Sequence, residues 1–190
     1  MKYKFTGKTK EYQNKTLHEI EAVRNFGNIK KGTVGGWIEK ESNLSHEGEC
    51  WVAGNAKVFG NALVYGDAQV YGDAQVYGDA QVYGDAEVCG DAWVYGDAEV
   101  FENAQVFGDA QVCGDAVVYG DAWVYGDTQL SGDAKVWGNA QVFGNALLSG
   151  SILGKKNQVL PEELSTLPEC IEEVTIRGEK YKKVTKWEKI

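Results

Sequence analysis

Side chains that can move a proton near neutral pH are rare in this sequence. It contains two histidines, His18 and His46, and neither lies in the repeated central segment. General-base catalysis at neutral pH most often uses histidine, because its pKa lies closest to that range. His46 stands near Asn43 and Ser45, which leaves a catalytic role open, but we interpret it as a turn residue. We therefore expect no catalytic residue and a protein that is not an enzyme.

The cysteine and aspartate residues of the chain do not have the spacing of a known metal-binding motif. The four cysteines are Cys50, Cys89, Cys113 and Cys170. None forms a Cys-x-x-Cys pair, so they predict neither a zinc site nor a disulfide framework, and they indicate a cytoplasmic protein. One set of stacked aspartates consists of Asp79, Asp97, Asp115 and Asp133. Such carboxylates could attract cations, but aspartate also forms turns, and we adopt the second interpretation and expect no metal or other cofactor.

Basic residues gather at the two ends of the chain. The candidates for neutralising a phosphorylated ligand are Arg24, Lys30, Lys31, Lys155 and Lys156. Residues 1–47 hold nine basic and six acidic residues (+3), residues 48–149 two and fifteen (−13), and residues 150–190 eight and seven (+1). The acidic middle would repel a phosphate backbone, so we expect no polynucleotide along it. No apolar run approaches the length of a membrane span, so we expect no membrane insertion.

A six-residue phrase, usually Gly-Asp-Ala-Gln-Val-Tyr, must position all of these residues. It occurs seventeen times without an insertion between Gly48 and Ser149. A unit this short cannot bury its own apolar face, so successive units must stack into a solenoid. Because side chains alternate along a strand, alanine and valine should point inward, and Gly-Asp or Gly-Asn should turn the chain between strands of about four residues. Glycine at every sixth place argues against a helix.

The phrase resembles the hexapeptide repeat of left-handed parallel β-helices. In that family an aliphatic residue is followed four places later by a small one, as Val70 is by Ala74. The resemblance implies an all-β fold with three hexads per coil and between five and six coils, so residues eighteen apart should stack. The coils would form a rod about 27 Å long. The place after the aliphatic residue is usually small in that family and mostly aromatic here.

Three segments carry a closer resemblance. Gly35-Gly36-Trp37-Ile38, Asn43-Leu44-Ser45 and Gly48-Glu49-Cys50-Trp51-Val52 resemble a poorly characterised group of bacterial and prophage-encoded hexapeptide proteins. Members of that group often carry a transferase label, which rests on analogy of fold. The resemblance implies a phage- or prophage-encoded protein that associates with itself, with a trimer favoured. Hexapeptide acyltransferases use a histidine base inside or beside the coils, and the hexads of this chain contain none.

Stacking at this interval predicts three outer columns. The first has an aromatic residue at every level and consists of Tyr65, Tyr83, Phe101, Tyr119 and Trp137. The second consists of Phe59, Tyr77, Tyr95, Cys113, Ser131 and Ser149, and the third of Ala53, Tyr71, Cys89, Phe107, Tyr125 and Phe143. Stacked rings stiffen a solenoid, but an unbroken aromatic column is also apolar enough to mark an interface. We predict that the first column lies in or beside the seam of a homo-oligomer.

Departures from the consensus phrase are where a special site would show, and they include four residues. Glu102 replaces a glycine, and Trp93, Val117 and Trp123 replace glutamine. We interpret each of them as drift in a repetitive gene.

The ends of the chain are predicted to cap the coils. Residues 1–47 should form an N-terminal cap, residues 48–149 the β-helix, and residues 150–190 a C-terminal cap. In the first cap, residues 17–23 suit helix and strand equally, and glycines at 27, 32, 35 and 36 predict tight turns. In the second, we expect a helical turn at residues 162–164 and a hairpin of residues 171–177 and 180–187 joined at Gly178.

Two classes of function follow from these observations. The first is a non-catalytic β-solenoid module, structural or binding, that presents aromatic faces and caps to a partner in a homo-oligomer. The alternative binds or sequesters a small phosphorylated ligand such as a signalling nucleotide, as in phage counter-defence, with aromatic residues stacked on the base and basic residues on the phosphates. An acyltransferase-like enzyme is the third hypothesis.

Overall fold

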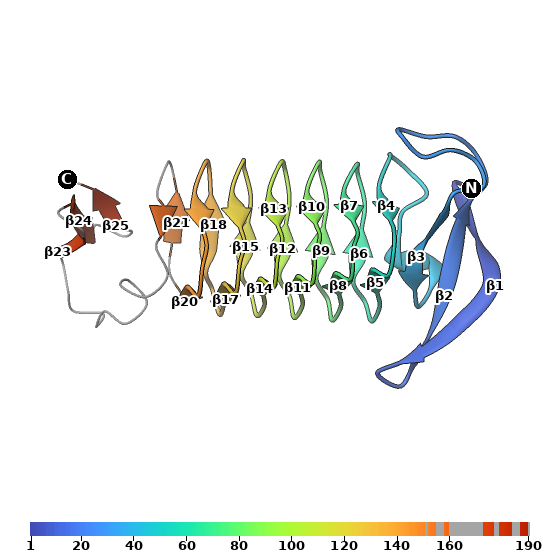
Figure 1. Ribbon diagram of the computed structural model, residues 1–190, viewed down its shortest axis with the longest axis horizontal. Coiled ribbons are helices and arrows are strands. Elements are labelled where there is room, and N and C mark those ends of the chain that lie inside the picture. The colour runs from blue at the N-terminus through green and yellow to red at the C-terminus, as the bar shows by residue number, and fades with distance from the viewer. Residues whose placement is uncertain (151, 155–157, 160–172, 177–178, 184–186, 190) are drawn as a thin grey trace.

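The computed structural model is a β-solenoid rod with an antiparallel hairpin at its N-terminal end (Figure 1). The structure describes residues 1–150, 152–154, 158–159, 173–176, 179–183 and 187–189. This part of the chain contains strands, one short 3-10 helix and no α-helix. None of its helical segments could therefore cross a membrane. The prediction of an all-β, parallel solenoid is confirmed.

Each hexad contributes one short strand and one corner. The hexad strands are β4 (Trp51–Val52), β5 (Lys57–Val58), β6 (Leu63–Val64), β7 (Gln69–Val70), β8 (Gln75–Val76), β9 (Gln81–Val82), β10 (Glu87–Val88), β11 (Trp93–Val94), β12 (Glu99–Val100), β13 (Gln105–Val106), β14 (Gln111–Val112), β15 (Val117–Val118), β16 (Trp123–Val124), β17 (Gln129–Ser131), β18 (Lys135–Trp137), β19 (Gln141–Val142) and β20 (Leu147–Ser149). Before them come β1 (Tyr3–Tyr12), β2 (Lys15–Ala22) and β3 (Val34–Ile38), and after them β21 (Ile152–Gly154) and β22 (Gln158–Val159). Most hexad strands have two residues, fewer than the four predicted, because each hexad must also supply a corner.

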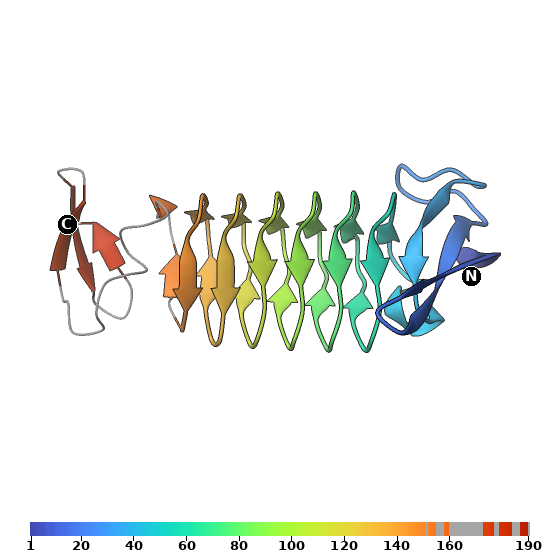
Figure 2. The same ribbon diagram turned by 60° about the horizontal axis from the view of Figure 1, so that its bottom comes forward.

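Every third hexad strand pairs in parallel, which makes three sheets along the rod (Figure 2). The nine-stranded sheet has the order β1-β2-β3-β5-β8-β11-β14-β17-β20, the seven-stranded sheet β22-β19-β16-β13-β10-β7-β4, and the six-stranded sheet β21-β18-β15-β12-β9-β6. Glu87 pairs with Gln105, eighteen residues further on. Backbone bonds join the coils, as where the N–H of Tyr83 donates to the carbonyl of Val100 at 3.0 Å. Three hexads per coil, as predicted, are thus confirmed.

Valine and alanine line the interior of the rod. From Val52 to Val142 these inward-facing side chains are at most 1% exposed, as the alternation of the phrase predicts. Two residues that replace alanine, Cys50 and Thr128, are fully buried as well. The hydroxyl of Thr128 donates to the carbonyl of Tyr125 at 2.7 Å, so this buried polar group has a partner.

The corners need glycine for two reasons. Gly72 has a φ of +75°, in the left-handed region that glycine enters without a steric penalty. A Cβ atom there would also lie 3.0 Å from the backbone N and O atoms of Gly90 in the next coil. Glu102 is the exception, because it adopts a φ of 58° at a glycine place. That conformation costs a residue with a side chain about 1–2 kcal/mol.

The N-terminal segment extends the nine-stranded sheet beyond the coils. Strands β1 and β2 form an antiparallel hairpin, so residues 17–22 are strand and not helix. The prediction of turns at Gly35 and Gly36 was wrong, because both lie within β3. A Cβ atom on Gly35 would lie 2.5 Å from the Trp51 side chain, so glycine there permits close packing. Parallel pairing begins where Trp37 meets Lys57, upstream of residue 48, and the predicted domain boundary stays a prediction.

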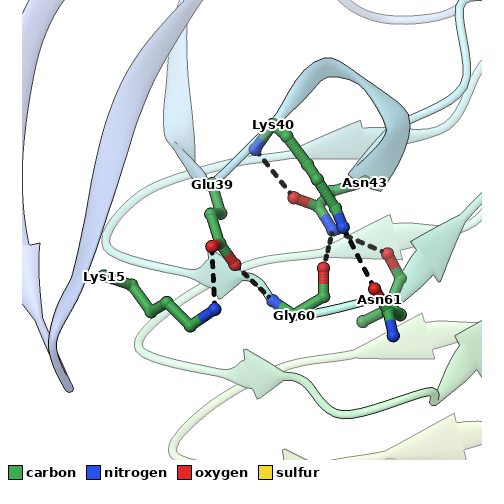
Figure 3. Close-up of polar contacts among 7 residues, drawn as sticks. Lys15, Glu39, Lys40, Asn43, Gly60 and Asn61 are labelled. Atoms are coloured by element: carbon green, nitrogen blue, oxygen red, sulfur yellow. Dashed lines mark hydrogen bonds and ion pairs between the residues drawn. The ribbon is translucent and has the colours of Figure 1, made fainter.

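Polar contacts fasten this segment to the first coils (Figure 3). The Glu39 carboxylate lies 2.9 Å from Lys15 Nζ and accepts a hydrogen bond from the N–H of Gly60 at 2.6 Å. Burial acts to raise the pKa of Glu39, but the Lys15 and Gly60 bonds outweigh it and hold the pKa below its ordinary value. Fully buried Asn43 donates from Nδ2 to the carbonyls of Gly60 at 3.2 Å and Ala62 at 2.9 Å.

Beyond Ser149 the parallel pairing continues with a shorter interval. Lys135 in β18 pairs with Ile152 in β21, seventeen residues further on. Strands β23 (Glu173–Ile176), β24 (Glu179–Lys183) and β25 (Trp187–Lys189) form an antiparallel three-stranded sheet, where two strands were predicted. The predicted helical turn at residues 162–164 and the joint at Gly178 lie outside the described residues.

Candidate functional site

The predicted first column runs along the six-stranded sheet as a stack of parallel rings. Its residues are Tyr65, Tyr83, Phe101, Tyr119 and Trp137, each placed directly after the valine of its hexad. Successive ring centroids lie 4.7, 4.8, 5.1 and 6.2 Å apart, with ring planes at most 14° from parallel. The constant register therefore brings all five residues together. We call this set the aromatic column.

Two tyrosines of the aromatic column also bond to the next coil. The hydroxyl of Tyr65 donates to Gln81 Oε1 at 3.1 Å, and that of Tyr83 to Glu99 Oε2 at 3.0 Å. Burial and then the hydrogen bond to Glu99 raise the pKa of Tyr83 well above its ordinary value. These phenols stay protonated at neutral pH, so they serve as links between coils and not as bases.

Aliphatic residues widen the aromatic column on one side. Leu63 and Val117 stand at the place in the hexad where glutamine is the commonest residue. Leu63 is 39% exposed, and Val117 is half-buried. The result is an apolar strip on the six-stranded sheet, the kind of surface that marks an interface.

The other two columns are interrupted. On the nine-stranded sheet, Tyr77 stacks between Phe59 and Tyr95 at centroid distances of 4.9 and 5.0 Å, and Cys113 then ends the stack. On the seven-stranded sheet, a stack of three rings begins only after Cys89 and consists of Phe107, Tyr125 and Phe143. Only the six-stranded sheet has a ring at each of its hexad levels within the described residues.

The predicted basic residues do not join the aromatic column. Arg24, Lys30 and Lys31 are exposed in the loop between β2 and β3. Their contacts stay within that loop: the Arg24 guanidinium lies 6.0 Å from the Phe26 ring, and the N–H of Lys31 donates to Asn25 Oδ1 at 2.8 Å. The two remaining candidates, Lys155 and Lys156, lie outside the described residues. The structure thus groups three of the five basic residues.

The two histidines make different contacts in the N-terminal segment. His46 Nδ1 accepts a hydrogen bond from the N–H of Lys2 at 3.2 Å, and its ring lies 4.4 Å from that of Tyr3. Burial and then the positive N-terminus lower the pKa of His46. His18 stacks on Phe5 at 4.6 Å. Among the described residues, no three or more His, Cys, Asp or Glu side chains are grouped to hold a metal ion.

A hollow on the nine-stranded sheet was missed by the sequence prediction. It encloses about 380 Å³ and is lined by Lys57, Asp73, Gln75, Asp91, Trp93, Asp109 and Gln111. Its aspartates come from three corners stacked eighteen residues apart, and the other residues come from β5, β8, β11 and β14. A signal was present, because Trp93 stands between Gln75 and Gln111 in the stacked register. We interpreted that tryptophan as drift.

Comparison with known proteins concerns the repeat segment. A family model described as YdcK Beta solenoid repeat matches residues 56–72, 68–84, 80–96 and 110–126. A stretch of 40 residues is 42% identical to a protein of Escherichia coli (strain K12) named Uncharacterized acetyltransferase YdcK. That match spans 21% of this chain and 12% of the length of the relative. The similarity therefore describes shared coils and not a shared whole protein.

Proposed function

From the premise that the coils of this chain are hexapeptide-like β-solenoid repeats, we propose that the protein is a non-catalytic binding module that assembles with itself. The aromatic column would meet a second copy of the chain, in a trimer by preference and in the cytoplasm. One observation carries this proposal: the six-stranded sheet presents an aromatic ring at five consecutive levels, flanked by Leu63 and Val117.

The charge of the rod supports an apolar seam. Residues 48–149 carry a formal charge of −13, so two copies repel each other wherever their carboxylates approach. Association then needs a strip in which apolar contact outweighs that repulsion, and interface cores are accordingly depleted of charge and rich in aromatic residues. The interior of the coils is lined mainly by valine and alanine, so additional apolar burial between copies would also stabilise the fold.

Mass measurement tests the proposal directly. Light scattering should give a multiple of the 20.8 kDa chain mass, and Phe101→Lys should reduce it to that of a single chain. Phe107→Lys is the matched control, because it makes the same change in the next hexad on the seven-stranded sheet, and it should leave the mass unchanged. Circular dichroism confirms that both variants are folded. A single-chain mass for the unchanged protein, or equal effects of both variants, contradicts the proposed seam.

A phosphorylated ligand is a second candidate because Arg24, Lys30 and Lys31 are exposed together on one loop. A cyclic nucleotide at about a hundredfold excess over its Kd would stabilise the fold by about 2.7 kcal/mol. Thermal unfolding with cyclic nucleotides and ADP-ribose, repeated on an R24A/K30A/K31A variant, tests it. Stabilisation lost in that variant would support sequestration of a signalling nucleotide and a role in phage counter-defence. No stabilisation of the unchanged protein would reject it.

Acyl transfer is a third candidate, favoured only by the name of the E. coli relative. His46 is the residue to test, although its Nδ1 is engaged by Lys2 and its Nε2 is buried with no partner in the described part of the chain. Release of free coenzyme A from acetyl-coenzyme A in the presence of amine or sugar acceptors would be the readout. Turnover that His46→Ala abolishes would contradict the non-catalytic proposal.

A further inference from the structure

The hollow on the nine-stranded sheet combines groups that the repeat alone does not supply. Carboxylates of Asp73, Asp91 and Asp109 follow one side of it at three successive coils, and all three residues are exposed. Gln75, Trp93 and Gln111 occupy the same three levels on the sheet. Levels in a parallel stack are about 4.8 Å apart, so the hollow offers a carboxylate at each of three regular steps along the rod.

Gln75 gives the hollow a hydrogen-bond donor that is held in a fixed position. Its residue is only 7% exposed, unlike the half-buried glutamines at most equivalent places. The hydroxyl of Tyr12, on the N-terminal hairpin, donates to Gln75 Oε1 at 2.8 Å and fixes the amide. Gln75 Nε2 makes no hydrogen bond to any residue that the structure describes, although Gln75 lines the hollow. Gln75 Nε2 is not among the buried atoms without a partner, so this N–H donor is open to the hollow and can bond to an acceptor atom of a ligand there.

Trp93 supplies an apolar surface between these polar groups. Trp93 is half-buried, and its indole packs edge-to-face against the ring of Tyr77, with a centroid distance of 6.5 Å. A fixed indole presents a large rigid apolar surface at little cost in conformational entropy. The C–H face of a pyranose ring is the kind of ligand surface that packs on such an indole.

The charges of the hollow select among classes of ligand. An anion would meet three carboxylates, and a polycation would meet Lys57 and leave the Gln75 amide donor without an acceptor. A hydroxyl both donates to a carboxylate and accepts from an amide or ammonium group. We propose that the hollow binds a neutral linear oligosaccharide, with one sugar ring on Trp93 and its hydroxyls shared between the aspartate and glutamine side chains. This proposal concerns a different sheet from the aromatic column and does not rest on self-association.

Titration of neutral tetrasaccharides into the full chain tests the proposal. Cellotetraose, maltotetraose and chitotetraose are the probes, with spermidine and a hyaluronan tetrasaccharide as the cationic and anionic comparisons, and saturation-transfer NMR and calorimetry as readouts. At least one neutral probe should bind saturably. Failure of all three, or binding of spermidine or hyaluronan alone, overturns the proposal.

Two variants locate the binding without changing the fold. Trp93→Gln restores the consensus residue of the repeat, so it should fold normally and weaken binding about tenfold. Asp91→Asn, also a residue found at other corners of the chain, should weaken it as well. Trp123→Gln makes the same change on the seven-stranded sheet and should leave affinity unchanged. Equal effects of Trp93→Gln and Trp123→Gln would show that the hollow is not the site. The assembly mass should be the same in all three variants, which separates this test from that of the seam.

Discussion

The N-terminal end and the coils of this protein are stabilised in opposite ways. In the coils, the same small contacts recur at each level, because the inward-facing side chains are almost all valine and alanine. At the N-terminal end, single large or polar residues are buried: Lys2 is fully buried, and its Nζ donates to the carbonyl of Cys50 at 2.7 Å and lies 3.1 Å from Cys50 Sγ. The hydroxyl of Tyr3 donates to the carbonyl of Leu44 at 2.9 Å. Loss of one residue should therefore matter far more at the N-terminal end than in the coils.

Three tryptophans at the same place in their hexads provide the sharpest test of this contrast. Trp51 is 1% exposed and packs against Phe26 of the N-terminal segment at 5.4 Å, whereas Trp123 is 40% exposed. Trp51→Ala should lower the free energy of unfolding by about 3–5 kcal/mol, the usual cost of deleting a buried tryptophan. Trp123→Ala should cost less than about 1 kcal/mol. Urea unfolding followed by circular dichroism measures both, and similar losses would contradict the contrast.

Two asparagines at the junction in Figure 3 test the polar side of the same contrast. Asn43 is fully buried and makes three hydrogen bonds, to the carbonyls of Gly60 and Ala62 and from the N–H of Lys40. Asn43→Ala should cost about 2–3 kcal/mol, because it leaves buried backbone groups without partners.

Asn61→Ala is the matched control, since the exposed side chain of Asn61 bonds to the side chains of Lys40 and Asp79 and to no buried group among the described residues. It should change the free energy of unfolding by less than about 0.5 kcal/mol. Urea unfolding of both variants gives the difference, and a cost for Asn61→Ala as large as that of Asn43→Ala would refute the role assigned to burial.

A substitution in the coils should stabilise the protein. Glu102 holds a left-handed conformation at a glycine place, so Glu102→Gly should raise the free energy of unfolding by about 1 kcal/mol. The reverse change two corners earlier, Gly90→Glu, should lower it, because Gly90 has a φ of +70° and a Cβ there would lie 3.0 Å from the backbone N of Gly108. Thermal unfolding compares the two variants. A loss of stability in Glu102→Gly would indicate that the Glu102 side chain makes a contribution larger than its backbone strain.

The smallest expected effect is a pH response of the N-terminal end alone. The pKa of His46 is lowered in the folded state by burial, so its neutral form is favoured there. That stabilisation is complete above the ordinary value of 6.5 and is lost as the pH falls below it toward the lowered pKa. Protonation would cost about 1 kcal/mol, the worth of the hydrogen bond that Nδ1 accepts from Lys2. The protection factors of amides in β1 and β2, which correct exchange rates for their intrinsic pH dependence, should fall between pH 7 and pH 5, and His46→Gln should remove this response.

The regular parts of the structure could be predicted because one rule repeats. In each hexad the alanine and the valine, such as Ala74 and Val76, stand on either side of one intervening residue, so their burial follows from strand geometry. The register of eighteen residues follows from three hexads per coil. The ring stack of the aromatic column followed from that register without further information. Its role as a seam stays a prediction.

Features that depend on contact with the N-terminal segment could not be predicted from the phrase. Trp51, Trp93 and Trp123 share one place in the repeat, yet packing by the loop that carries Phe26 buries only the first. In the hollow, the amide of Gln75 is fixed by the hydroxyl of Tyr12, although the two residues are 63 positions apart in the chain. A contact between residues so far apart in the chain could not be predicted from any local sequence pattern.

Because the pairing interval is constant, deletions of eighteen residues and of six residues should change the rod in different ways. Excision of residues 84–101 removes one complete coil, so Tyr83 would be followed by the hexad that belongs on the next sheet, and every column below would stay on its own side. Excision of residues 84–89 alone removes one hexad, and each downstream column would move to the neighbouring side of the prism. Gain or loss of eighteen residues in such a gene therefore changes the length of the rod and keeps each column on its own sheet. Gain or loss of six residues nearly keeps the length of the rod and moves the downstream columns to a different sheet.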